Sequence, residues 1–545
     1  MIRFSRMAAV KERFVLDSRS AILCGCVAAL FLLHALYLAC VAEDAYITFH
    51  YAQNLVAGHG FVWNVGEPPV EGYTNFLWLL LCAGVLALGL DLPVTSQVLG
   101  LAAGLWTLVY VYRAALMLGS SARSALLPAL ALACSGPFAA WSTSGMETSA
   151  FALFVTAAIF HASRFDCEAD ARDLRWTIGA LLLATLTRPE GLLIAVSVAA
   201  VAVLGSVEPK PLAVSRRRAI AAGAGVYGLV IAAFVVWRWN YFGYPLPNSF
   251  YAKTGGGLAQ AVRGAEYAGL FALHFVLPWV LSAVLGLVNR AHTTPGSAAR
   301  SVVRLCAAGV VPYVLYIALV GGDYMAMYRF FVPVLPALYL LIHSLVLRSM
   351  RDVDASSARG TWVKVGVLLG LAGTLFHSTP LESEWVEKPD RMHGNYRGIQ
   401  TERWYVARHR LIGEFFARYG RPGESLATGA IGAVAFGSGL AIYDVHGVVD
   451  SHIAHEGRAR GELGSGLPGH EKTDYPYIFD KQPTFYIFSR KLREQPLAGM
   501  PLLVPEVDAR VAREYRVGSV FLEDSVNGES GYFSFLERRD RASRR

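Results

Sequence analysis

Long runs without a charged residue follow one another through the first 381 residues, and they constrain the fold more than any other feature of the chain. A helix that spans a bilayer needs about 20 consecutive apolar residues. Runs of roughly this kind, free of Asp, Glu, Lys and Arg, cover residues 20–42, 74–90, 95–112, 124–146, 148–163, 176–187, 192–207, 219–237, 267–289, 305–322, 330–347 and 365–381. The sequence therefore predicts a polytopic α-helical membrane protein.

Composition excludes the main alternatives. Charged residues make up 17% of the 545 residues, against about 25% in soluble proteins, so a soluble enzyme of this size could not cover its surface. The net charge of +8 is attributed to cytoplasmic loops, which carry an excess of Lys and Arg, and not to nucleic-acid binding. The seven cysteines, none beyond residue 306, lack the spacing of a disulfide framework or a metal site. No metal ligand is predicted.

The basic loops predict the topology. Basic residues precede the first run, so we expect a cytoplasmic N-terminus in the inner (cytoplasmic) membrane, with that run as an uncleaved helix. All later basic connections are cytoplasmic only if one early run does not span, and we assign this role to 74–90, as a helix lying in the outer interface or re-entering from outside. The prediction is eleven spans, interfacial helices and an external C-terminus.

The runs 176–187 and 192–207 are interpreted as a helical hairpin. Twelve helical residues cover about 18 Å, which is less than a hydrocarbon core about 30 Å thick. Arg188-Pro189-Glu190 interrupts the pair. We expect the turn within the outer half of the membrane.

Residues 382–545 differ from the transmembrane module 1–381, because charged, glycine and aromatic residues return and long apolar runs end. They predict a C-terminal extracytoplasmic α/β domain. Its glycines at 429, 432, 437 and 439 do not have the G-x-G-x-x-G spacing and indicate turns, not a dinucleotide site. The expected elements are a helix over Arg403–Tyr419 and strands over Glu424–Gly429, Ala441–Val445, Thr484–Ser489 and Ser519–Glu523.

Ionisable residues placed among the apolar runs all fall on the outer face in this topology. Such residues cost several kcal/mol in a membrane unless they are paired or hydrated, so their convergence predicts a water-filled cavity open to the outside. They are Glu43, Asp44, Glu147, Arg188, Glu190, Lys253, Asp323 and Arg329.

Each of these residues has a functional and a structural interpretation. Adjacent carboxylates such as Glu43-Asp44 can supply a base beside a group that binds substrate or metal, or they can simply be a solvated helix cap. Glu147 can interact with the dipole of the helix that follows it.

Each of the three cations also has two interpretations, and the structural one is strongest for Arg188. Lys253 can bind phosphate as a point charge or be a solvated loop residue. Arg329 can bind phosphate through two hydrogen bonds or pair with Asp323. Arg188 can do the same or pair with Glu190 across the turn.

The segment 43–90 is predicted to be an external catalytic loop with an interfacial helix. Its aromatic and polar residues alternate in a way that suits binding of a sugar or a lipid headgroup, and that also suits an interfacial aromatic belt. The candidate sugar- or acceptor-binding residues are His50, Tyr51, His59, Trp63 and Tyr73.

Several signatures are absent from the sequence. There is no P-loop, no H-E-x-x-H and no nucleophile-elbow serine motif. These absences argue against an ATP-driven pump, a zinc protease and a serine hydrolase.

The order and spacing of the polar segments resemble those of the polyprenyl-phosphate-dependent membrane glycosyltransferases with the GT-C fold, and more closely the AftB-like arabinofuranosyltransferases. The segments that carry the likeness are Glu43-Asp44-Ala45-Tyr46-Ile47, Gly58–Asn64, Glu71-Gly72-Tyr73-Thr74, Gly145-Met146-Glu147, Arg188-Pro189-Glu190-Gly191, Asn248–Lys253, Gly321-Gly322-Asp323 with Arg329, and Gly469-His470-Glu471-Lys472.

The resemblance implies a reaction and a set of partners. The donor would be a polyprenyl-phosphoryl sugar such as polyprenyl-phosphoryl-arabinofuranose, with its tail in the lipid bilayer. The acceptor would be a hydroxyl of a cell-envelope glycan or of a pilin-like protein. The chain is shorter than mycobacterial members of the family, and some relatives carry a flagellar-motor-control name.

The residues then take expected roles. Asp44 is the base, with its pKa raised by the neighbouring Glu43, and Glu43 orients it or holds a divalent cation if the reaction uses one. The donor phosphate is bound by Lys253, Arg329 or Arg188. Sugar- or acceptor-binding roles extend to Glu147, Glu190, Asp323 and His470, and the first three are candidate nucleophiles if the reaction retains configuration.

Two other functions fit the same features. Broken hydrophobic hairpins occur in transporters, so a transporter or flippase for a lipid-linked sugar is one alternative. A non-catalytic envelope or motility factor is the other.

Overall fold

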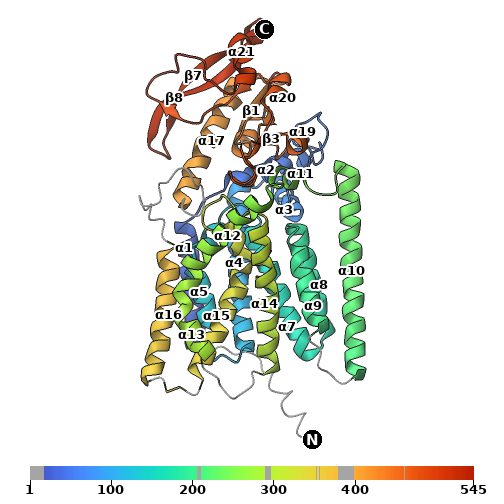
Figure 1. The fold of residues 1–545 in the computed structure, drawn as a ribbon, viewed down its shortest axis with the longest axis vertical. Coiled ribbons are helices and arrows are strands. Elements are labelled where there is room, and N and C mark those ends of the chain that lie inside the picture. The colour runs from blue at the N-terminus through green and yellow to red at the C-terminus, as the bar shows by residue number, and fades with distance from the viewer. Residues whose placement is uncertain are drawn as a thin grey trace.

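The computed structural model describes residues 17–204, 210–288, 296–351, 353–354, 356–378, 398–459 and 461–544. Long helices stand side by side in a bundle, and an α/β region covers one end of it (Figure 1). The bundle comprises α1 (Ser18–Tyr37), α2 (Glu43–Val56), α3 (Phe76–Ala87), α4 (Leu92–Met117), α5 (Leu126–Ala133), α6 (Gly136–Trp141), α7 (Thr148–Glu168), α8 (Ala171–Thr187), α9 (Gly191–Leu204), α10 (Lys210–Phe242), α11 (Asn248–Lys253), α12 (Gly257–Phe271), η2 (Ala272–Val276), η3 (Leu277–Trp279), α13 (Val280–Val288), α14 (Ser297–Leu319), η4 (Arg329–Val334), α15 (Leu335–Met350) and α16 (Ala358–Phe376).

The predicted class, a polytopic α-helical membrane protein with a C-terminal α/β region, is confirmed. The count of eleven spans remains a prediction. Within the described residues, seven helices are long and apolar enough to cross a membrane: Ser18–Tyr37, Leu92–Met117, Thr148–Glu168, Val214–Phe242, Gly257–Val288, Ser297–Leu319 and Arg329–Met350.

Two apolar runs are divided in the structure. Residues 20–42 do not form one helix, because α1 ends at Tyr37 and α2 begins at Glu43. Residues 124–146 are also not one helix, since α5 and α6 are separated at Ser135, whose backbone is extended. Pro137 lies in the first turn of α6, where its missing N–H costs nothing, whereas inside a continuous helix it would remove a backbone hydrogen bond.

The other two unusual runs form helices, and their positions in the membrane remain a prediction. The run 74–90 forms α3, only 12 residues long, or about 18 Å. The runs 176–187 and 192–207 form the packed helices α8 and α9, with residues 205–207 outside the described part. One expectation was wrong: α8 has 17 residues and begins at Ala171, because Asp170 caps it by accepting the Arg172 backbone N–H.

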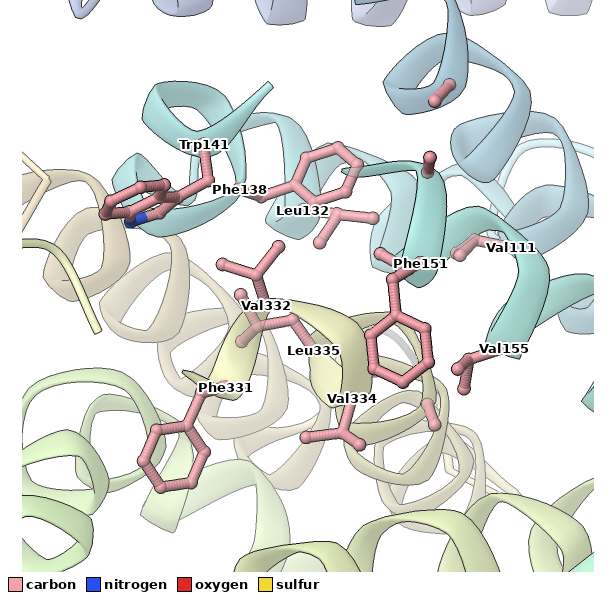
Figure 2. Close-up of a cluster of buried hydrophobic side chains, with 14 of the residues drawn as sticks. Val111, Leu132, Phe138, Trp141, Phe151, Val155, Phe331, Val332, Val334 and Leu335 are labelled. Carbon is pink, nitrogen blue, oxygen red and sulfur yellow. The ribbon is translucent and has the colours of Figure 1, made fainter. Parts of the chain in front are cut away.

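A buried apolar cluster joins the short helix α6 to α7, η4 and α15 (Figure 2). Phe138, Phe151 and Leu335 are fully buried within it. The indole N–H of Trp141 donates to the Ala326 carbonyl at 3.1 Å. This core therefore fixes the connection between α14 and η4, which carries Asp323.

The C-terminal region is built on one mixed sheet. Its strand order is β2-β1-β5-β8-β6, and β7 pairs with β8. The β1 strand is parallel to β2 and β5, whereas β8 is antiparallel to its neighbours. The elements are α17 (Ile399–Tyr419), β1 (Ser425–Thr428), α18 (Gly432–Ser438), β2 (Ala441–Asp444), α19 (Ser451–Glu456), β3 (Arg458–Ala459), β4 (Lys472–Thr473), α20 (Tyr475–Asp480), β5 (Phe485–Tyr486), β6 (Leu492–Arg493), α21 (Pro505–Glu514), β7 (Tyr515–Asp524), β8 (Glu529–Arg538) and η7 (Arg539–Arg544).

Helix α2 and the loop that follows it share a hydrophobic core with the C-terminal sheet. Tyr51 and Trp63 pack in one cluster with Phe416 and Ile442. The Ile442 N–H donates to the Asn64 side chain at 2.9 Å, and the Trp63 indole donates to the Ile442 carbonyl at 2.9 Å. The two parts of the chain are therefore packed against each other. The predicted boundary between 381 and 382 lies outside the described residues.

Candidate functional site

A cavity of about 630 Å³ lies where the helical bundle meets the C-terminal region. It is lined by the loop before α3, by the α8–α9 turn, by α11, by the α14–η4 connection and by loops of the α/β region. The predicted residues that line it are Glu43, Asp44, Tyr73, Glu147, Arg188, Glu190, Lys253, Asp323, Arg329 and His470. Segments far apart in the sequence thus come together as one polar site.

Asp44 lies in the first turn of α2 and faces this cavity. The Tyr324 hydroxyl donates to its Oδ1 at 3.2 Å, and Arg329 Nη1 lies 3.7 Å from its Oδ2. Its side chain retains 19% exposure. The carboxylate is therefore both held in place and open to a ligand.

Glu43 also lines the cavity, and its side chain contacts the C-terminal region. Its Oε1 accepts the backbone N–H of Ala433 at 3.1 Å, at the start of α18. Burial, and then the charge of Asp44, raise the pKa of Glu43 to about 8. Because its pKa lies above neutrality, Glu43 favours the protonated form at pH 7.

Arg188 is enclosed by carboxylates. Its Nη1 lies 2.6 Å from Glu147 Oε1, and its Nη2 lies 2.8 Å from Glu190 Oε1. Asn75 donates to the other Glu147 oxygen at 2.8 Å, and the Tyr316 hydroxyl donates to Glu190 at 3.1 Å. The α8–α9 turn is therefore tied to the start of α7 and to α14.

Arg329 is also paired with a carboxylate. Its Nε donates to Asp323 Oδ2 at 2.6 Å, and its guanidinium lies over the rings of Trp141 and Phe330. Arg329 therefore lies beside two carboxylates, those of Asp323 and Asp44.

Lys253 differs from both arginines. Its ammonium makes no ion pair or hydrogen bond to any residue in the described part of the chain. Gly469 lies against its aliphatic stem, since a Cβ there would be 2.9 Å from Lys253 Cε. Gly469 also has a φ of +79°, which a side chain would disfavour. The loop that carries His470 thus packs on the one cavity cation without a described partner.

Four predicted binding residues do not line the cavity. His50 contacts the Trp63 carbonyl through Nε2 at 2.9 Å, and the Tyr51 hydroxyl donates to the Val70 carbonyl at 2.6 Å. With Trp63, they fold the loop and hold it to the C-terminal sheet. His59 is exposed at the loop tip.

Several cavity residues were missed by sequence reasoning. His446 lies with its ring centroid 4.7 Å from that of His470, and Tyr324 lies 5.0 Å from His470 on another side. Burial, and then His446, lower the pKa of His470 to about 4, so its imidazole is neutral at pH 7. Tyr324 could have been found as the neighbour of Asp323, whereas Asp444 ends the short strand β2 and His446 follows it, without any signal in the sequence. No group of three or more His, Cys, Asp or Glu in the described ranges is arranged to hold a metal ion.

The Arg188 cluster leads to a stability prediction. Arg188→Met leaves two buried carboxylates without their cation, and we expect the free energy of unfolding to fall by about 3–5 kcal/mol. Thermal unfolding of the purified protein in detergent would show it. Arg172→Met, at an exposed position of the same helix, is the control. Equal melting temperatures for the two variants would contradict this account.

Comparisons with solved structures found several similar chains. The ArnT protein of Cupriavidus metallidurans bound to undecaprenyl phosphate has a TM-score of 0.57 and 13% identity, covering 96% of this chain and 98% of that one. Its apo structure gives a TM-score of 0.55 at 13% identity, covering 95% and 97%. The archaeal oligosaccharyltransferase AglB of Archaeoglobus fulgidus, in complex with an inhibitory peptide and a dolichol-phosphate, gives 0.48 at 12%, covering 95% and 74%.

Sequence comparisons add little. A family model described as a domain of unknown function (DUF8728) matches residues 394–536. A search of curated proteins found no match. The ArnT structures, which align over nearly the whole chain, show that the chain has the GT-C-like fold expected from its sequence.

Proposed function

We propose that the chain is a membrane glycosyltransferase that moves a sugar from a polyprenyl-phosphate donor to a hydroxyl of a cell-envelope glycan or protein on the outer face of the membrane. One observation carries the proposal. The cavity holds a lysine without a described partner and a carboxylate open to a ligand, and exposed apolar side chains border both.

The charges of the cavity favour one phosphate ligand. Arg188 is compensated by Glu147 and Glu190, and Arg329 by Asp323 and Asp44. Their carboxylates would repel a phosphate as much as the guanidiniums attract it. The donor-phosphate role therefore goes to Lys253, and the two arginines organise the site.

The apolar wall suits a lipid chain. Leu192 and Val196 of α9 line the cavity and are 48% and 60% exposed, and Leu246 and Phe250 border it with 40% and 45% exposure. These exposed apolar side chains lie next to the polar groups of the cavity, and a soluble protein would bury such a surface. The ArnT structure that shares this fold was solved with undecaprenyl phosphate bound, a ligand of the proposed chemical class.

The residues support a single displacement. Asp44 takes the proton of the acceptor hydroxyl, whose oxygen bonds to the anomeric carbon of the donor sugar. The bond from that carbon to the phosphate oxygen breaks, and polyprenyl phosphate leaves with the electron pair, stabilised by Lys253. Glu147, Glu190 and Asp323 are committed to arginines, so none is placed as a second nucleophile. The product would have inverted configuration.

Arabinofuranose as the sugar rests on the resemblance to the AftB-like enzymes. The test is to reconstitute the full chain in liposomes with labelled polyprenyl-phosphoryl-arabinofuranose, or a polyprenyl-phosphoryl hexose, and an envelope extract. We expect labelled acceptor and free polyprenyl phosphate from the arabinofuranose donor, with an inverted anomeric signal by NMR. Movement of the donor across the bilayer without turnover would instead identify a flippase.

The proposal requires a defined orientation. We propose that residues 1–381 form the membrane module in the inner membrane, with a cytoplasmic N-terminus and 43–90 as its external loop. Residues 382–545 would then lie in the periplasm or its equivalent. A reporter fused to the C-terminus should be active only if it works outside the cytoplasm, and a fusion to the N-terminus should behave in the opposite way. A C-terminal reporter active in the cytoplasm would contradict this.

A further inference from the structure

Arg263 of α12 connects two distant segments of the chain, although it does not line the cavity itself. Its Nε donates to the Gly321 carbonyl at 3.0 Å, in the connection between α14 and η4. Its Nη1 donates to the Gly466 carbonyl at 2.7 Å and lies 3.4 Å from Glu471 Oε1. The side chains of Arg263 and Glu471 are only 10% and 8% exposed. One nearly buried guanidinium therefore joins the helical bundle to a loop of the C-terminal region.

The loop between β3 and β4 is folded by the partner of this arginine. Glu471 Oε1 accepts the backbone N–H groups of Gly464 and Gly466, each at 2.8 Å. Gly464 has a φ of +94°, and a Cβ on Gly256 would lie 2.4 Å from its Cα. Side chains at these two glycines would strain the conformation and prevent the close approach. The carboxylate thus shapes the loop, and Arg263 fixes the shaped loop to α12.

The end of this loop forms the cavity wall beside the cation that has no described partner. Gly469 and His470 both line the cavity. A Cβ on Gly469 would lie 2.9 Å from Lys253 Cε, so the loop backbone packs on the lysine stem. The ring centroid of His470 lies 5.0 Å from that of Tyr324. Any movement of the loop would therefore change the surroundings of the Lys253 ammonium.

The other contact of Arg263 leads to the carboxylate side of the cavity. Gly321 has a φ of +87°, and a Cβ there would lie 2.6 Å from Arg263 Nη2. Asp323 and Tyr324 follow within three residues. The Tyr324 hydroxyl donates to Asp44 at 3.2 Å. The same guanidinium thus borders the segment that holds Asp44 and the loop that packs on the lysine.

We propose that Arg263 is a positioning residue for sugar transfer, and that with Glu471 it sets the placement of Lys253 relative to Asp44. The inference rests on the proposed function, in which these two groups act on opposite sides of the anomeric carbon. A displacement of about 1 Å caused far from the reacting atoms can cost about 10²-fold in rate. Arginine suits this role because its planar group donates several hydrogen bonds in a fixed geometry.

The test compares Arg263→Gln with Arg493→Gln, which removes an exposed arginine of β6 outside the cavity. Turnover of the labelled donor in liposomes and binding of a non-transferable polyprenyl phosphate would be measured for the full-length protein. We expect Arg263→Gln to lower kcat by about 10–100-fold, with little change in polyprenyl phosphate affinity because Lys253 remains. The control should match the unmodified protein. Arg263→Lys should recover part of the loss, because its charge can still pair with Glu471.

Hydrogen exchange gives a readout that does not depend on turnover. In Arg263→Gln, the backbone amides of residues 320–325 and 461–471 should both exchange faster than in the unmodified protein, because one group holds both segments. Glu471→Gln keeps an oxygen that can accept the two loop N–H groups and removes only the charge. Its faster exchange should be confined to the loop, and its kcat should fall less than that of Arg263→Gln.

The outcomes separate this inference from the proposed function. An unmodified protein that turns over no donor would overturn the proposed function, and the positioning role with it. Wild-type kcat in Arg263→Gln would overturn the positioning role alone, and so would a loss of rate that only follows the loss of folded protein in thermal unfolding. If Arg263→Gln does not fold, Glu471→Gln decides the question, and wild-type kcat in that variant would refute the role.

Discussion

Replacing Asp44 with Asn is expected to lower sugar transfer by about 10²–10⁴-fold, the usual cost of losing a general base. Asn keeps the size of the side chain and can still accept the hydrogen bond from Tyr324, so the fold and donor binding should survive. The measurement is single-turnover transfer from the labelled donor in liposomes. The Michaelis constant for the donor should change little, because Asp44 acts on the acceptor hydroxyl.

Glu43→Gln is the matched comparison at the neighbouring position. With a pKa raised to about 8, Glu43 is mostly protonated at pH 7, and Gln resembles that neutral form. Gln also retains an oxygen that can accept the Ala433 N–H. We expect this variant to keep most of its activity. If Asp44→Asn retained more than about a tenth of the wild-type rate, the base assignment would fall, and Glu147, Glu190 and Asp323 would be tested next.

Lys253→Met should reduce turnover by about 10²–10³-fold, comparable to the removal of one preorganised group that stabilises charge developing in the transition state. The Met side chain keeps the apolar stem that packs on Gly469 and removes only the ammonium, so the melting temperature should stay within the error of the measurement. Donor affinity, measured with a non-transferable polyprenyl phosphate, should fall together with turnover.

Lys491→Met provides the control, since Lys491 is exposed in the C-terminal region and does not line the cavity. It should match the unmodified protein in affinity and rate. Unchanged donor affinity in Lys253→Met would remove the phosphate role from Lys253. Attention would then return to Arg329, whose guanidinium would have to exchange Asp44 for the phosphate.

The membrane part was largely predictable because the bilayer imposes a simple rule of length and charge on each helix. The rule does not predict where an extended residue and a proline end one helix and begin the next. Pro137 lies within the uncharged run 124–146, and only the observed break at Ser135 shows that it begins a new helix. The C-terminal region follows weaker rules. The strand β8 was not predicted, although Asn527-Gly528 before it is a common hairpin turn and Gly528 has a φ of +64°.

The site residues that lie among apolar helices could be predicted from the sequence, whereas those in the C-terminal region could not. Charged residues are costly among apolar helices, so Glu147 and Arg188 stood out in the sequence. In the C-terminal region, polar residues are ordinary, and nothing distinguished His446 from its neighbours. The aromatic residues of α2 and of the loop that follows it were predicted to bind sugar, because their composition suits sugar binding as well as packing. Trp63 and Tyr51 are buried against a sheet nearly 400 residues later, which no local pattern reveals.

The hydrogen bond from the start of α18 to Glu43 has a consequence for how this protein can be divided or recombined. The segment 394–536 matches a family model of its own, yet Glu43, which accepts a hydrogen bond from that segment, also lines the cavity beside Asp44. A chimera that imports the segment from another protein would also import one wall of the cavity, and it would have to recreate this contact beside Asp44. Residues 43–90 and the segment 394–536 should therefore be exchanged together. We expect the two to have changed together during evolution.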